Sequence, residues 1–231
     1  MSTFNAKSID LSNSHTQGKS LQVKAAEGHV TSDSAQVNAE NIVLDAGTYI
    51  SNRHGEIKGE TVSLTAPQLI DNTKGKITQT GSRELSFNAN ELNNQQGEIN
   101  ARGVLTFNNQ ILKNQKGNIQ SLGNQLIVKT TELNNQQGII SLPKQGLLAI
   151  ETQHLSGREG TLLSAGDLSL QGQLLDLEKA TTQADNITIT ATNLNHDNAT
   201  LKQTGDKTTF ITVKQTLSNQ QGKIQTQDQL T

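Results

Sequence analysis

The sequence predicts an all-β protein, a right-handed parallel β-helix (a solenoid) of about ten coils with repeats of about 20–21 residues. Three observations predict this fold. A polar phrase returns at a fixed spacing, apolar and polar residues alternate between its copies, and the composition is unusual, because 32% of the 231 residues are hydrophobic and only 2% are aromatic. So few rings cannot fill a globular core of this size, whereas a thin column of aliphatic side chains needs few.

The recurring phrase has the form Leu-x-Asn-x-x-Gly-x-Ile, and we call its first residue the anchor. The eight intervals from Gly55 to Gly222 average about 21 residues, a period typical of solenoids. This regularity argues against a disordered low-complexity segment, which the richness in Asn and Gln would otherwise suggest. The clear copies are Ile50–Ile57, Ile70–Ile77, Leu92–Ile99, Leu112–Ile119, Leu133–Ile140 and Leu217–Ile224, and the weaker ones are Leu155–Leu162, Leu175–Thr182 and Leu194–Leu201.

Between these copies lies a second phrase, Leu-x-Leu, whose period of two indicates a strand. The next anchor usually follows five residues after its second apolar residue, as from Phe107 to Leu112. No window shows the apolar spacing of an amphipathic helix, so we expect almost no helix. The copies are Val62–Leu64, Leu85–Phe87, Leu105–Phe107, Leu126–Val128, Leu148–Ile150, Leu168–Leu170 and Ile187–Ile189.

Each repeat therefore offers two or three short strands separated by turn residues. This suits one coil of a solenoid stacked ~4.8 Å from the next, and right-handed coiling follows from the rule for parallel crossovers. The anchor, the Ile after the glycine and the Leu-x-Leu residues are expected to point inward, with Phe87 over Phe107. Leucine-rich repeats share the period, but they need a denser leucine pattern.

Each clear copy also places an asparagine at one corner of the coil. Stacked asparagines predict an amide ladder whose side chains bond the backbone of the bend and one another. The alternative is a glycan or metal site, but repetition in every coil favours architecture over a local site. These asparagines are Asn52, Asn72, Asn94, Asn114, Asn135 and Asn219.

The glycine of each copy is expected to supply a positive φ at the same corner. Ala180 and Ala199 depart from this pattern, and the coil from Leu175 has Thr182 where an inward Ile is expected. We therefore expect that coil to be distorted or bulged. The corner glycines are Gly55, Gly75, Gly97, Gly117, Gly138, Gly160 and Gly222.

No linker or break in composition divides the chain, so residues 1–231 are expected to form a single rod. Residues 50–224 carry the clear repeats. Residues 1–49 are expected to form less regular coils, with Val23–Val30 and Ile42–Leu44 as degenerate copies.

The alternation of Leu-x-Asn-x-x-Gly-x-Ile with Leu-x-Leu resembles the haemagglutinin repeats of the filamentous haemagglutinin family. These long surface exoproteins of Gram-negative bacteria include adhesins and the toxin-delivery proteins of contact-dependent growth inhibition. The resemblance implies a stretch of rod exported by two-partner secretion, with an outer-membrane transporter as the partner during export. It also implies a secreted or cell-surface location, with the signal peptide outside these residues.

Charge and cysteine content exclude several other classes of protein. Nineteen basic and 21 acidic residues leave a net charge of −2, which offers no electrostatic footprint for nucleic acid or anionic lipid. The absence of cysteine excludes a disulfide scaffold, a thiol nucleophile and a cysteine zinc site. No stretch approaches the ~18 apolar residues of a membrane span.

Parallel β-helices also host carbohydrate-active enzymes, which need carboxylates converging on one groove. When the repeats are placed in register, no two or three carboxylates are expected to align as a cluster across neighbouring coils. The five histidines show no metal-ligand spacing, and no catalytic or nucleotide-binding motif is present. We therefore expect no enzyme, no metal and no cofactor. The residues considered are Glu56, Glu91, Glu98, Glu132, Asp167 and Asp185, with His15, His29, His54, His154 and His196.

The sequence thus predicts a non-catalytic stalk segment of a secreted adhesin or toxin-delivery exoprotein. The alternative is a module that binds a glycan or a target-cell receptor on one exposed face, and a carbohydrate-active enzyme is the third hypothesis. A glycan-binding face would need a column of exposed rings. The sequence offers only Tyr49, Phe4 and Phe210 for it.

Overall fold

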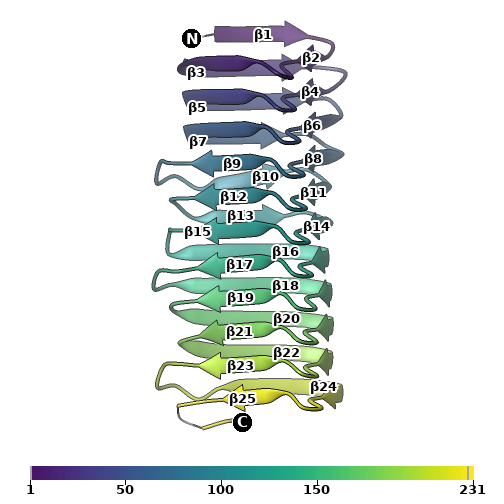
Figure 1. The fold of residues 1–231 in the computed structure, drawn as a ribbon, viewed down its shortest axis with the longest axis vertical. Coiled ribbons are helices and arrows are strands. Elements are labelled where there is room, and N and C mark those ends of the chain that lie inside the picture. Colours follow the sequence, from purple (N-terminus) through teal and green to yellow (C-terminus); the bar gives the residue numbers. More distant parts are fainter. Residues whose placement is uncertain (1, 228) are drawn as a thin grey trace.

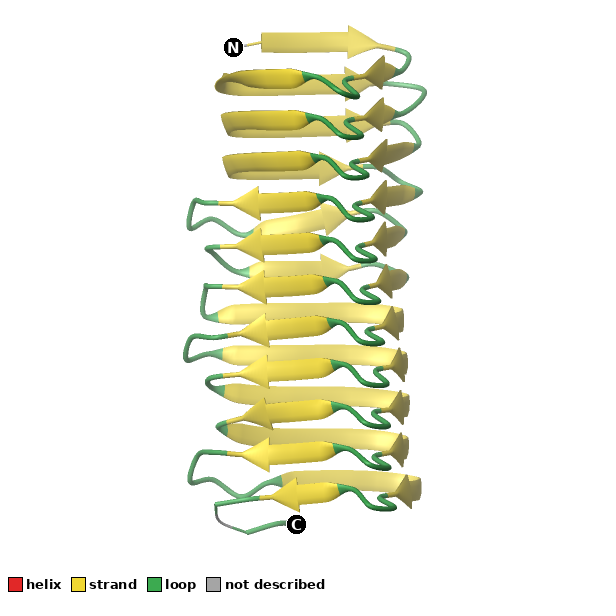
Figure 2. Ribbon diagram, viewed as in Figure 1, coloured by secondary structure: helices red, strands yellow, loops and turns green. Residues whose placement is uncertain are grey.

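The computed structural model describes residues 2–227 and 229–231, which form strands and loops with no helix (Figure 2). Its 25 strands join in a single parallel sheet that coils into a rod with the chain termini at opposite ends (Figure 1). The predicted all-β parallel β-solenoid is therefore confirmed. None of the described residues lies in a helix that could cross a membrane.

The coil is right-handed. As the chain descends from its amino terminus, near strands such as β12 (Glu98–Ala101) run to the left and far strands such as β13 (Leu105–Asn108) run to the right (Figure 1). Eleven corners, each marked by one non-glycine residue with positive φ, give about eleven coils. This is one coil more than the sequence predicts.

Each coil has three faces. We call them the glycine-side face, which follows the corner glycine, the Leu-x-Leu face and the anchor face. The glycine corner (residues 135–138 in one coil) joins the anchor face to the glycine-side face, and the loop corner (residues 143–146) leads to the Leu-x-Leu face. The third corner (residues 151–153) leads back to the anchor face, and we call it the groove corner after a hollow that is described below. In the first coils one long strand bends through the loop corner, and in the last coils one long strand bends through the groove corner.

The strands fall into four groups by the faces that they occupy. The glycine-side face alone holds β9 (Lys76–Gln79), β12, β15 (Asn118–Ser121), β17 (Ile139–Leu142), β19 (Thr161–Ser164), β21 (Thr181–Ala184), β23 (Thr200–Gln203) and β25 (Lys223–Gln225). The Leu-x-Leu face alone holds β1 (Ser2–Ala6), β10 (Leu85–Asn88) and β13, and the anchor face alone holds β2 (Ile9–Asp10), β4 (Val30–Thr31), β6 (Tyr49–Ser51), β8 (Leu69–Asp71), β11 (Glu91–Asn93) and β14 (Ile111–Lys113). The strands β3 (His15–Ala25), β5 (Gln36–Ala46) and β7 (Glu56–Thr65) span the loop corner, and β16 (Gln125–Asn134), β18 (Leu147–Ser156), β20 (Asp167–Asp176), β22 (Asn186–Asn195) and β24 (Phe210–Ser218) span the groove corner.

Aliphatic columns fill the interior of the rod, because in-register pairing stacks like residues over like. On the glycine-side face Ile77, Ile99 and Ile119 pair in sequence, and each is fully buried. The rings of Phe87 and Phe107 stack inside with centroids 5.3 Å apart and planes 4° apart, as the sequence predicts. Two rings on neighbouring coils therefore suffice where a globular core would need many.

The strands of residues 2–51 pair in the same way as those that follow. β3 and β5 pair from His15↔Gln36 to Ala25↔Ala46. Val23 and Leu44 of this pair are fully buried. Regular coiling therefore begins well before the first clear copy of the repeat phrase.

The coil that starts at Leu175 is not distorted, contrary to the expectation from its sequence. Its strands β20 and β21 pair with β22 and β23 in continuous register, and Thr182 is 1% exposed in the inward column. The register shift comes one coil later, where β22 pairs with β24 between Ala191 and Asn193. There β24 carries one additional residue, which the pairing leaves out.

Candidate functional site

The asparagines of the glycine corner form a chain of hydrogen bonds along the rod. Asn52 donates through Nδ2 to Oδ1 of Asn72, and the relay passes through Asn94 and Asn114 to Asn135, with each distance 2.7–2.8 Å. Each Nδ2 also donates to the carbonyl three residues ahead at 3.2–3.3 Å. These side chains are at most 1% exposed, so they satisfy the backbone of the bend and leave no free amide for a ligand.

The corner glycines do not supply the positive φ, and that prediction is wrong. The residue with φ of 55–57° stands one position earlier at each corner, as Lys116 does before Gly117, and the same φ occurs where alanine replaces the glycine, as at Lys179 before Ala180. The glycine is needed for another reason. A Cβ on Gly117 would lie 2.2 Å from the carbonyl oxygen of Asn94 and 2.5 Å from Oδ1 of Asn114, closer than any side chain could approach.

The amide ladder is interrupted over three coils, where Gly157, Leu177 and His196 occupy the asparagine position. Asn219 therefore stands apart from the continuous ladder, and its Oδ1 lies 2.7 Å from Nδ1 of His196. Nε2 of His196 is buried without a hydrogen-bond partner among the described residues. Ala180 and Ala199 belong to these interrupted coils, where no Oδ1 of an asparagine from the same coil crowds the glycine position.

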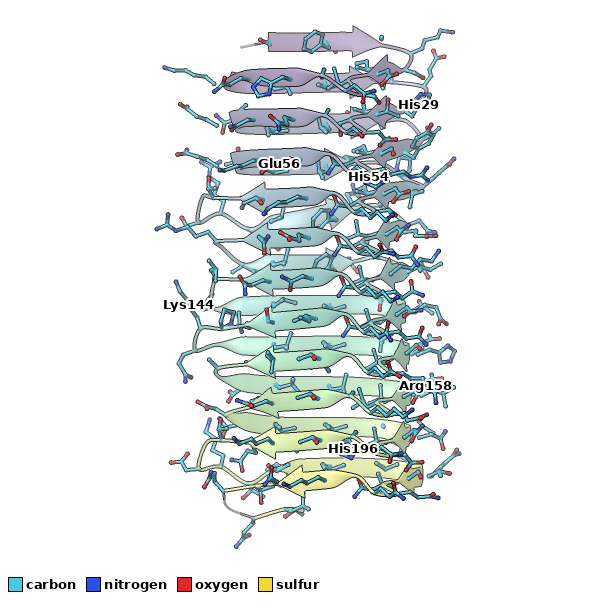
Figure 3. All side chains as sticks on the ribbon, in the orientation of Figure 1. His29, His54, Glu56, Lys144, Arg158 and His196 are labelled. Atoms are coloured by element: carbon cyan, nitrogen blue, oxygen red, sulfur yellow. The ribbon has the colours of Figure 1, made fainter. Side chains whose placement is uncertain are left out.

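Carboxylates on the outer faces mostly pair with a neighbour one coil away. Glu98 lies 3.0 Å from the Lys76 ammonium, Glu91 2.6 Å from Lys113, and Glu132 2.6 Å from Nδ1 of His154. Asp167 receives a 2.6 Å hydrogen bond from Asn186, and Asp185 receives a 2.8 Å hydrogen bond from Gln145. Glu56 is the first residue of β7, where the chain enters the glycine-side face (Figure 3).

Two groups of carboxylates gather around arginines, contrary to the expectation that none align across neighbouring coils. Arg53 donates to Oδ2 of Asp71 at 2.7 Å, and the nearby Asp33 accepts the backbone N–H of Arg53 at 2.8 Å. The pKa of the Arg53 guanidinium is raised, first by the hydrogen bond to Asp71 and then by the charge of that carboxylate. Sequence reasoning missed this group because it followed the column of corner asparagines, whereas Asp71 and Asp33 occupy two different columns of the same corner.

The second group surrounds Arg158, which contacts Glu178 and lies 3.5 Å from Oδ2 of Asp176. Burial raises the pKa of the Asp176 carboxyl, Arg158 and a hydrogen bond from Asn195 lower it, and the charge of Asp197 raises it further. Each group thus has one arginine that pairs with its carboxylates. Neither presents two free carboxyls on a groove, which glycoside hydrolysis requires.

The histidines are spread along the rod, and Figure 3 labels His29, His54 and His196. His15 contacts Gln36 at 2.9 Å, and His54 is one of the positive-φ corner residues. Within the described residues, no group of three His, Cys, Asp or Glu side chains could hold a metal ion.

The exposed aromatic residues do not form a platform for sugar rings. Tyr49 stacks on His29 with ring centroids 4.8 Å apart and planes 7° apart, so one face of its ring is covered. Leu69 is its register partner on the other side. Phe4 lies on β1 in the first coil, and Phe210 lies on β24 near the other end.

The structure also shows a feature that the sequence pattern did not reveal, a long hollow at the groove corner. One part, of about 610 Å³, runs from Pro67 to Glu151, and a second, of about 420 Å³, runs on to Lys214. The two parts share Thr130, Thr131 and Glu151, so they adjoin along the rod, and we call them together the groove. Sequence reasoning missed it because this corner has no repeated phrase.

A comparison of sequences relates this architecture to a known protein. The chain is 28% identical over 200 residues to Toxin CdiA of Yersinia pestis. The chain is a distant homologue of Toxin CdiA. The alignment covers 82% of this chain and 5% of Toxin CdiA, so the chain spans a small part of that protein's length. This homology confirms the resemblance to two-partner secretion exoproteins drawn from the repeat. No protein-family model and no solved structure matches the chain.

Proposed function

We propose that this segment is part of the stalk of a secreted, cell-surface exoprotein of a Gram-negative bacterium. In this role it holds a binding or toxin region away from the cell. The observation that carries the proposal is the near-continuous register of about eleven coils. Each additional coil lengthens the rod by one strand spacing. The distant homology to Toxin CdiA supports the class of exoprotein, and export would use an outer-membrane transporter of the two-partner type.

The proposal includes the absence of catalysis by this segment. The carboxylates that the coils bring together surround Arg53 and Arg158, and five of the six carboxylates considered from the sequence, all but Glu56, have lysine, histidine or amide partners. Acid–base chemistry on a glycan needs one protonated and one free carboxyl facing the same bond. The arrangement around the two arginines supports a structural role instead.

Coil deletion in the full-length parent protein tests the stalk role. Deletion of residues 112–132 removes one anchor-to-anchor repeat and joins Ile111 to Leu133, so the columns and the amide ladder can close again. We expect export and surface function to persist with a rod about 4.8 Å shorter. The matched control deletes residues 112–122, about half a coil, and is expected to disrupt the rod at the junction because the coils on either side of the deletion no longer pair in register. Loss of surface function after the whole-coil deletion, in a protein that is still exported and folded, would contradict a pure stalk.

A further inference from the structure

The shape and side chains of the groove corner support an inference that goes beyond the stalk role. The groove follows the bend between the Leu-x-Leu face and the anchor face, where the long strands β16, β18, β20 and β22 turn (Figure 1). Residues from Pro67 to Lys214 line it, which covers seven steps from coil to coil. At ~4.8 Å per step the groove is about 34 Å long.

The hollow arises from the side chains at the middle of each bend. Ala89, Thr152, Gly172 and Ala191 occupy this middle position on their coils, and they are small. Thr152 is 4% exposed, and its hydroxyl donates to the carbonyl of Thr131 at 3.0 Å. The residues on either side of the middle position are longer and stand outward, so they form two walls.

The walls are made of amides and hydroxyls. Thr131 donates to Oε1 of Gln110 at 3.1 Å, and the Lys129 ammonium lies 3.7 Å from the Glu151 carboxylate. Most of the amides have no side-chain hydrogen bond to another described residue, in contrast to the paired asparagines of the glycine corner. These amides are Asn88, Asn90, Asn108, Gln153, Gln171 and Gln173.

The residues that line the groove include no column of exposed rings, which a glycan-binding face is expected to need, but their free amides offer a donor and an acceptor side by side, which matches the hydroxyl groups of sugars even where no aromatic ring is present. The Lys129–Glu151 pair leaves Lys214 as the one unbalanced charge among the residues that line the groove, so an anionic polymer gains little there. The lining has no aromatic ring on which a nucleic-acid base could stack. An extended peptide would need a free strand edge or apolar pockets, and the strands of this corner pair on both sides.

We propose that this groove binds a neutral polysaccharide chain lying along the rod axis. The unpaired amides on successive coils contact successive sugars, whose length in an extended chain is close to the coil spacing. Each hydrogen bond to a sugar replaces one to water, so a single sugar gains little and binding depends on many sugars in a row. The groove therefore discriminates by the length of the glycan.

Affinity gel electrophoresis of the described segment tests the proposal, with soluble neutral polysaccharides (dextran, galactomannan and arabinogalactan) in separate gels. At least one is expected to retard the segment. A glucose, galactose or mannose monomer is not expected to reverse the retardation, whereas oligosaccharides of the same polymer are. The double variant Gln153→Ala/Gln173→Ala is expected to lose affinity about tenfold, since it removes two amides from the walls.

The matched control is Gln22→Ala/Gln183→Ala, which removes two amides that do not line the groove. It is expected to bind as the parent does, and circular dichroism checks that both double variants keep the β-signal. Absence of retardation in all three gels overturns the proposal. Equal retardation of the groove variant and the parent does so too. In a fourth gel that contains heparin, retardation found only there and abolished by added salt also overturns it. None of these outcomes bears on the stalk role, which the coil deletion tests separately.

Discussion

At the scale of single residues, the glycine corner shows why two residue types recur together. Asparagine at the corner directs its Oδ1 toward the position three residues ahead, where a Cβ on Gly75 would lie 2.6 Å from Oδ1 of Asn72. Glycine therefore accompanies asparagine, and alanine accompanies Leu177 and His196. The positive φ falls on the preceding residue, which is of six different types over the eleven corners, so no single residue type marked it in the sequence.

The substitution Gly117→Ala tests this explanation. Its Cβ would collide with the backbone of the previous coil and with Asn114, so the free energy of unfolding is expected to fall by roughly 1–3 kcal/mol. Urea denaturation followed by circular dichroism measures the change. The reverse change, Ala180→Gly, is the control and should lower stability by only about 0.5–1 kcal/mol, because it adds chain entropy and removes no bond. Equal effects of the two substitutions would contradict the role assigned to close approach.

Stability is expected to depend on pH in opposite ways at two aspartates. The pKa of Asp176 is raised above its ordinary value of 3.8. Its contribution to stability is therefore fully present below pH 3.8 and is lost as pH rises through the pKa of the folded state. Asp176→Asn should raise the melting temperature at pH 7, and the gain should vanish below pH 3.8.

For Asp10, hydrogen bonds from Ser12 and Thr31 lower the pKa to about 2. Its contribution is present above pH 3.8 and is lost as pH falls through about 2, so Asp10→Asn should lower the melting temperature at pH 7. Thermal melts from pH 2 to pH 7 compare the two variants. A shift of the same sign for both at pH 7 would refute the assignment.

At the scale of strands, inward columns give each coil its stability, and their residues were largely predictable. The period of two identified Leu85–Phe87 and Leu105–Phe107, and the structure pairs them in that register. The carboxylate groups were not predictable, because Arg158, Asp176 and Asp197 belong to three coils of unequal length. The groove was missed for a related reason, since small residues at one bend leave no periodic signal.

Leu133 tests the inward columns. It is 2% exposed on β16, and Leu133→Asp would place a carboxylate among aliphatic side chains with nothing to bond. We expect a loss of about 3–5 kcal/mol and faster hydrogen exchange in the neighbouring coils. Asn134→Asp on the same strand is the control, because position 134 faces outward and a carboxylate still accepts the N–H of Gln136. A melting temperature unchanged by Leu133→Asp would mean that this leucine faces solvent.

At the scale of the whole molecule, the rod is a one-dimensional stack in which each coil contacts its neighbours. Its stability is then close to a sum of coil terms and interface terms, and its length is proportional to the number of coils. The same geometry aligns equivalent residues along the axis. That alignment produces the amide ladder where side chains pair and the groove where they do not.

The distance between two labelled coils tests this stacking most directly. The natural chain has no cysteine, so Ser86→Cys and Thr188→Cys can be spin-labelled without background. Both positions face outward in one column of the Leu-x-Leu face, and register pairs link them in five steps. Double electron–electron resonance should give a narrow distribution near 24 Å, five spacings of ~4.8 Å. A broad distribution centred above about 50 Å, as for a flexible chain of this length, would contradict the solenoid.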